Sequence, residues 1–102
     1  MPPLSSQLDT PPLRPVVYLF TADGCPACAH AEPEWERFKQ RNPATLALEF
    51  DAEGPYPSHF GIRIVETPTY VLRVGERAVP HSGAMRAEQL ERWIKAATRA
   101  VE

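Results

Sequence analysis

Two cysteines three positions apart are the residues of this sequence best suited to chemistry. Cys25 and Cys28 enclose a proline and an alanine, and they are the only cysteines among the 102 residues. Two cysteines placed at random in such a chain would have this spacing only about one time in fifty. A thiol pair at this spacing can exchange with disulfides, help to bind a metal or, with a histidine directly after it, attach a haem. The spacing alone leaves these three chemistries open.

The segments on either side of the pair favour redox chemistry. The apolar run from Val16 to Phe20 is typical of a strand buried on both faces. After a short turn, the pattern predicts a helix from about Cys25 to Arg41. A helix N-terminus stabilises a thiolate through its free N–H groups and the positive end of its dipole. We therefore predict that Cys25 is the nucleophile and that Cys28, one turn later, is the resolving thiol.

The rest of the chain predicts one α/β domain. Further strands are expected from Thr45 to Asp51, from Thr69 to Val74 and, after a tight turn, from Arg77 to His81. A short helix is expected from Pro57 to Phe60, and a final helix from Arg86 to Ala100. Strand, helix and strand in succession make a βαβ unit, whose crossover should be right-handed.

The N-terminal segment differs in composition from the rest. Residues 1–15 contain five prolines, which exclude a long helix or a central strand there. We therefore predict a proline-rich arm over residues 1–15 and a single domain over residues 16–102, a length that suffices for one modest core.

Charge and hydropathy exclude several classes of partner. The formal net charge is −2, the sequence pI is about 5.9, and no basic stripe appears, so nucleic acid is not an expected partner. No apolar run is long enough to span a membrane. The first residues lack the charged and apolar regions of a secretory signal, which makes the cytoplasm the expected compartment. A structural disulfide is disfavoured there, so the cysteines are expected to be catalytic or metal-binding.

The order of the predicted elements and several short motifs resemble the thioredoxin family. Pro33 stands five residues after the second cysteine, where the family carries a helix-kinking proline. Thr67-Pro68 is similar to the family's cis-proline loop, and Gly83 to the glycine loop before its last helix. The resemblance covers roughly residues 16–100.

This resemblance implies a minimal thioredoxin fold. The expected architecture is a four-stranded mixed sheet in the order 2-1-3-4, flanked by about three main helices. The bond before Pro68 is then cis and faces the two cysteines, and the backbone of Thr67 hydrogen bonds to an extended substrate. The implied substrate-binding residues are Gly24, Pro26, Ala27, Thr67, Pro68 and Gly83.

The resemblance also implies a function. It is that of a monomeric thiol–disulfide oxidoreductase that needs no cofactor of its own. Its partners would be disulfide-containing proteins and an electron donor such as a thioredoxin reductase or glutathione.

The sequence departs from the family at residues around the motif. Gly24 replaces the tryptophan that usually precedes the first cysteine, and Leu19 stands where thioredoxins carry a buried acid. The usual lysine partner of that acid falls near Ala47. The proton acceptor for Cys28 is therefore not assigned by the resemblance. Three residues near the motif loops are candidates for this role: Glu66, Asp23 and His30.

Two alternatives of other classes remain open. One is an adaptor with the same fold whose cysteines stay idle, which the missing acid favours. The other is a small metal-binding protein that uses Cys25, Cys28 and His30. A structural zinc site normally takes four ligands, however, and no second pair follows at the usual spacing. The residue after Cys28 is Ala29 and not histidine, which argues against a c-type haem.

Overall fold

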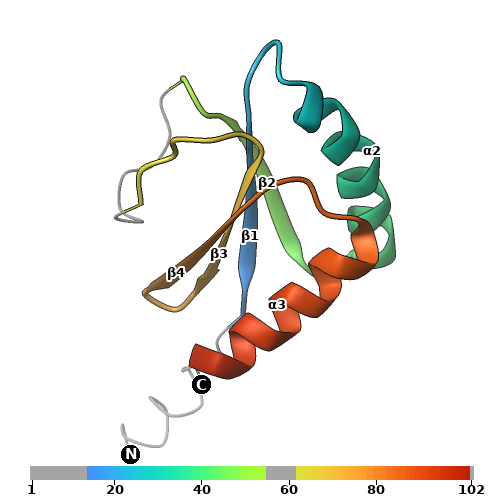
Figure 1. The fold of residues 1–102 in the computed structure, drawn as a ribbon. Helices are drawn as coiled ribbons and strands as arrows, with labels where there is room; N and C mark the ends of the chain where they lie inside the picture. Colours follow the sequence, from blue (N-terminus) through green and yellow to red (C-terminus); the bar gives the residue numbers. More distant parts are fainter. Residues whose placement is uncertain (1–13, 55–61, 102) are drawn as a thin grey trace, which may run out of the picture.

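A four-stranded sheet with two helices on one of its faces forms the fold (Figure 1). The structure is a computed structural model that describes residues 14–54 and 62–101. Its elements, in chain order, are β1 (Val16–Thr21), α2 (Pro26–Arg41), β2 (Leu46–Asp51), β3 (Thr69–Val74), β4 (Arg77–Ser82) and α3 (Ala87–Val101). These bounds agree with those predicted from the sequence to within one residue.

The strand order is β2-β1-β3-β4, which confirms the predicted mixed sheet. β1 pairs in parallel with β2 and antiparallel with β3, and β3 pairs antiparallel with β4. β1 is therefore central, with a neighbour on each side and residues 17–20 all buried. This central position explains why its sequence is an unbroken apolar run, because each face of the strand contacts a hydrophobic layer.

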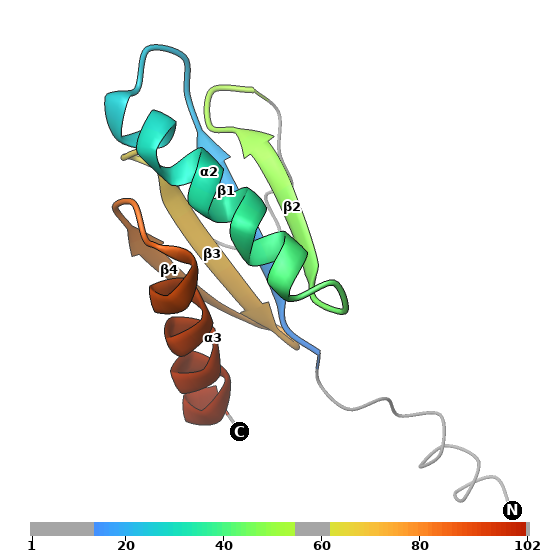
Figure 2. The same cartoon turned by 90° about the vertical axis from the view of Figure 1, so that its right-hand side faces the viewer.

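The main core lies between the sheet and the two helices, which run side by side across it (Figure 2). The predicted apolar stripe of α2 is buried, and Trp35 and Phe38 belong to it. Their rings stack with centroids 5.7 Å apart, and the Trp35 ring lies 6.1 Å from Tyr70 of β3. Leu90 is the main buried contribution of α3. A helix with one such stripe gains most of its stability from this packing.

The opposite face of the sheet carries a second, smaller cluster. Phe50 of β2 stacks between Tyr18 and Phe20 of β1, with ring centroids 5.8 and 5.6 Å apart. Nearer the start of β2, on the same face, Leu46 and Leu48 are 55% and 37% exposed. The alternation that predicted this strand is thus correct, although two of its apolar residues lie at the surface.

Ion pairs join the two helices along their polar flanks. Arg37 of α2 donates to both carboxylate oxygens of Glu88 at 2.7 and 2.8 Å. Arg41 bonds to Glu88 at 2.9 Å and to Glu91 at 2.8 Å. In addition, Glu34 accepts the backbone N–H of Ala87, the first residue of α3, at 2.9 Å. A carboxylate of α2 thereby caps the N-terminus of α3, which complements the dipole of that helix.

This network predicts an acid-sensitive contribution to stability. The hydrogen bond from Arg37, together with Glu88's own backbone N–H, lowers the pKa of Glu88 from 4.5 to about 2. Such a carboxylate stabilises the fold above its ordinary pKa, and this stabilisation is lost as the pH falls from about 4.5 toward 2. We expect Glu88→Gln to lower the melting temperature at pH 7. The difference from wild type should shrink through that window.

Melting curves of both proteins from pH 7 to pH 2 check this. Glu76→Gln is the matched control, because Glu76 is exposed in the β3–β4 turn and forms no ion pair with the residues that the structure describes. A difference between Glu88→Gln and wild type that stays constant down to pH 2 would contradict the assignment.

Some expectations fall outside the described residues. The short helix predicted from Pro57 to Phe60, and residues 1–13 of the predicted N-terminal arm, lie there. About three main helices were expected, and the described part of the chain contains two of them, α2 and α3. Within that part, neither helix has the length and hydrophobicity needed to cross a bilayer.

Candidate active site

The turn between β1 and α2 places the cysteines at the start of the helix. Gly24 has φ +70°, a left-handed conformation that glycine adopts without strain. Cys25 follows in an extended conformation as the N-cap residue, and Pro26 is the first residue of the helix. Proline suits this position because its missing N–H would have no partner inside the helix.

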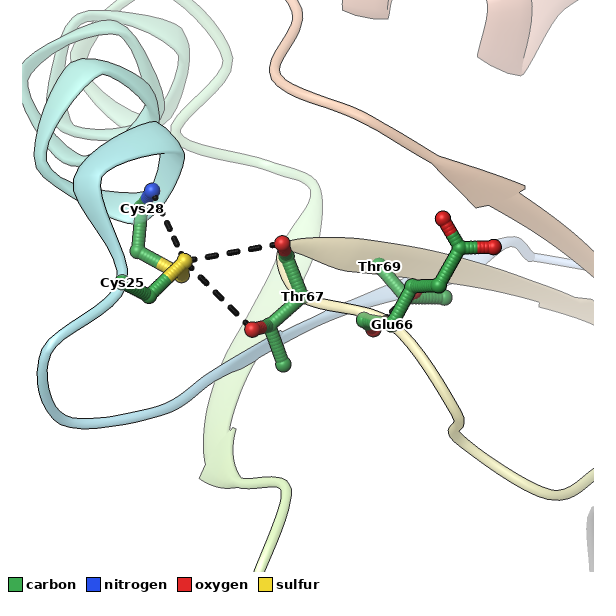
Figure 3. The surroundings of a disulfide bond; sticks show 5 residues. All are labelled: Cys25, Cys28, Glu66, Thr67 and Thr69. Carbon is green, nitrogen blue, oxygen red and sulfur yellow. Dashed lines mark hydrogen bonds between the residues drawn. A yellow bond between two sulfur atoms is a disulfide. The ribbon is translucent and has the colours of Figure 1, made fainter.

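The sulfur of Cys25 serves as the cap of the helix. Cys25 Sγ accepts a hydrogen bond from the backbone N–H of Cys28 at 3.1 Å (Figure 3). The two cysteines are joined by a disulfide, with their Cα atoms 5.2 Å apart. Cys25 is partly exposed, whereas Cys28 is only 3% exposed. The two sulfurs are therefore inequivalent, since only the first lies within reach of a large partner.

The loop before β3 contacts the first cysteine. The Thr67–Pro68 peptide bond is cis, the isomer that the resemblance implies. Thr67 Oγ1 donates to Cys25 Sγ at 3.4 Å, and the Thr67 carbonyl oxygen lies 3.5 Å from the same sulfur (Figure 3). Residues 42 positions apart in the sequence thus meet at one sulfur atom.

Gly83 connects this loop to the segment before α3. Its backbone N–H donates to the carbonyl oxygen of Pro68 at 2.9 Å, and its φ is +101°. The structure thus brings together the residues predicted to bind substrate around Cys25 and Thr67. Of these, Gly24, Pro26, Ala27 and Gly83 are exposed and Pro68 is buried.

The backbone of Gly83 predicts a stability effect. Gly83→Ala is expected to destabilise the protein by about 1–2 kcal/mol, because a Cβ is strained at a left-handed φ. The added Cβ would meet no atom within 4 Å, so the cost is conformational and not a clash. Denaturant unfolding measures it. Gly54→Ala is the control: its Cβ would contact Asp51 at an ordinary 3.5 Å. Equal losses in the two variants would contradict this explanation.

The three residues predicted as proton acceptors are all exposed: Glu66, Asp23 and His30. Figure 3 shows the Glu66 carboxylate directed away from the sulfurs. The backbone carbonyl of Glu66 accepts a hydrogen bond from Thr69 Oγ1 at 2.6 Å, which fixes the loop without using the carboxylate. Among the hydrogen bonds found within residues 14–54 and 62–101, none joins these side chains to a cysteine sulfur.

Two other carboxylates, which the sequence analysis passed over, lie beside the buried Leu19. Glu49 stands opposite Leu19 in the parallel register of β1 and β2. Its Oε2 accepts hydrogen bonds from Trp35 Nε1 at 2.7 Å and from Lys39 Nζ at 3.1 Å. Glu32 of α2 lines the same two surface hollows as Glu49. The strand register would have identified Glu49, but that register depends on the fold.

The described residues around the cysteines do not form a group of metal ligands. Within the described residues, no three histidine, cysteine, aspartate or glutamate side chains are grouped so that they could hold an ion. Both sulfurs are in the disulfide, and His30 is exposed on α2.

Comparison with known proteins decides the family. The family model described as thioredoxin matches residues 6–96, which is most of the chain. The chain belongs to the thioredoxin family. Together with the bonded cysteine pair, this membership supports thiol–disulfide oxidoreductase chemistry in general terms.

Solved thioredoxins share this fold at low sequence identity. Fasciola hepatica thioredoxin is 21% identical with a TM-score of 0.70, over 91% of this chain and 89% of that one. Thioredoxin f from spinach chloroplast is 23% identical with a TM-score of 0.66, over 84% and 78%. The periplasmic thioredoxin SoxS from Paracoccus pantotrophus is 18% identical with a TM-score of 0.70, over 87% and 100%. A comparison with curated protein sequences gives no match.

Proposed function

We propose that this thioredoxin-family protein exchanges disulfides with protein substrates, with Cys25 as the attacking thiol and Cys28 as the resolving thiol. The observation that carries the proposal is the position of Cys25 Sγ. It accepts the N–H of Cys28 at the start of α2 and the hydroxyl of Thr67 from the facing loop. Hydrogen bonds to a sulfur anion are stronger than those to a neutral thiol, so both donors favour the thiolate that acts as nucleophile.

The reaction proceeds in two exchanges. The Cys25 thiolate attacks one sulfur of a substrate disulfide, forms a mixed disulfide and releases the other substrate sulfur as a thiolate. Cys28 then loses its proton and attacks Cys25 Sγ, which releases the second substrate sulfur. The products are a substrate dithiol and the Cys25–Cys28 disulfide, the form seen in the structure. The second exchange is intramolecular and is therefore favoured by a high effective concentration.

The substrate surface proposed here surrounds the exposed side of Cys25. Pro26 and Ala27 are exposed beside it on α2, and Thr67 faces it from the loop before β3. An extended polypeptide can hydrogen bond to the backbone of Thr67 as a strand would, with its own disulfide against Cys25. The proposed partners are therefore disulfide-containing proteins, and an electron donor such as a thioredoxin reductase or glutathione would restore the reduced state.

The direct test is reduction of insulin disulfides by the wild-type protein with dithiothreitol as donor. We expect catalysis above the rate of dithiothreitol alone. Equilibration with glutathione then gives the reduction potential, for which about 30 mV corresponds to a tenfold change in equilibrium. A protein that shows no dithiol–disulfide cycling at any potential would instead support a binding adaptor with idle cysteines.

A further inference from the structure

We propose that Glu32 accepts the proton of Cys28 during the second exchange, through water held in the hollow between α2 and β2. The inference rests on the proposed function, because it assigns a residue to one step of that cycle. It begins from the burial of Cys28, which is 3% exposed. A thiol so enclosed needs a nearby acceptor before it can attack, since only the thiolate is nucleophilic.

The side chain beneath the start of α2 is no acceptor. Leu19 is 1% exposed and packs in the core below the helix. Carboxylates are found instead at the side of Leu19 that faces β2. Two adjoining hollows of about 400 and 270 Å³ open there, and Thr21, Glu32 and Glu49 line both. Spaces of this size with several polar walls can hold water.

Helix geometry places Glu32 next to Cys28. They are four positions apart, so they are neighbours on one side of α2, with Cβ atoms about 5–6 Å apart. Side chains on a helix lean toward its N-terminus, which for Glu32 is the direction of the turn that carries Cys28. Glu32 is exposed, so its carboxylate is open to the water of the hollows. Glu36 lines the larger hollow as well but lies one turn farther from the cysteine.

The charged groups around the hollows leave Glu32 available. Lys39 of α2 bonds to Glu36 at 3.0 Å and to Glu49 of β2 at 3.1 Å. Asp23 from the turn after β1 and Asp51 of β2 face the smaller hollow. Glu32 has no ion pair with any residue that the structure describes. It is therefore a carboxylate without a fixed cation.

The test separates the two exchanges in one experiment. Reduced protein is mixed with one equivalent of dithiobis(nitrobenzoate) in a stopped-flow instrument. Attack by Cys25 releases the first coloured thiolate, and attack by Cys28 on the mixed disulfide releases the second. Glu32→Gln should leave the first phase unchanged and slow the second at pH 7 by at least about tenfold. This loss should diminish as the pH approaches about 8.5, where a thiol ionises without help.

Glu36→Gln is the matched control, because it removes a carboxylate from the same hollow and the same helix. It should leave both phases as in wild type. Equal slowing of both phases in Glu32→Gln, or a second phase with the wild-type pH profile, would overturn the assignment of Glu32. A wild-type protein that shows no second phase would instead overturn the proposed function.

Discussion

Cys25→Ser is expected to lower the rate of insulin reduction by at least about a thousandfold, because a hydroxyl cannot replace the attacking thiolate. Serine is the appropriate substitute, since it is among the best N-cap residues and can keep the cap of α2 that the sulfur now provides. Alanine would remove the nucleophile and the helix cap together. Melting curves should therefore show a Cys25→Ser protein close in stability to reduced wild type.

Cys28→Ser separates the second step from the first. The variant should still attack a substrate disulfide through Cys25, but it should stop at the mixed disulfide because no thiol remains to resolve it. Intact-mass spectrometry after incubation with substrate detects that adduct. Adduct formation by Cys25→Ser instead would reverse the assigned roles, and insulin reduction by Cys25→Ser at the wild-type rate would exclude the mechanism.

Trp35→Ala is expected to produce the largest loss of stability, about 3–5 kcal/mol, by emptying the centre of the main core. The side chain is 1% exposed and packs between α2 and the sheet. Its ring contacts Phe38 and Tyr70, and Nε1 donates to Glu49. Chemical denaturation with an unchanged m-value measures the loss.

Trp35→Phe serves as the control that keeps an aromatic ring. It removes the indole N–H, but the Glu49 carboxylate is 48% exposed and can bond to water and Lys39. The expected loss is therefore smaller, about 1–2 kcal/mol. If the two variants were equally unstable, the hydrogen bond to Glu49 and not the packing would dominate.

The elements of this fold were predictable because each has a local signature. The run from Val16 to Phe20 is apolar because β1 is buried in the sheet. The stripe of α2 repeats at steps of three and four because one side of the helix is buried. The pairing of Cys25 with the loop at Thr67 needed the family resemblance, because a contact across 42 residues has no local pattern.

The features that could not be predicted depend on register and on helix packing. Glu49 stands opposite Leu19 only because β1 and β2 are aligned in one particular register. The bonds of Arg37 and Arg41 to Glu88 similarly require the angle at which α2 and α3 lie together. In the sequence these are ordinary charged residues of two amphipathic helices.

The hydrogen bond from the Cys28 N–H to Cys25 Sγ couples the start of α2 to the redox state of the cysteines. The same atom is a helix cap and a redox centre, and a thiolate accepts an N–H more strongly than a disulfide sulfur does. This one hydrogen bond is therefore stronger in the reduced protein than in the oxidised one. By thermodynamic linkage, the free energy that the bond gains on reduction is the free energy by which it favours reduction of the disulfide.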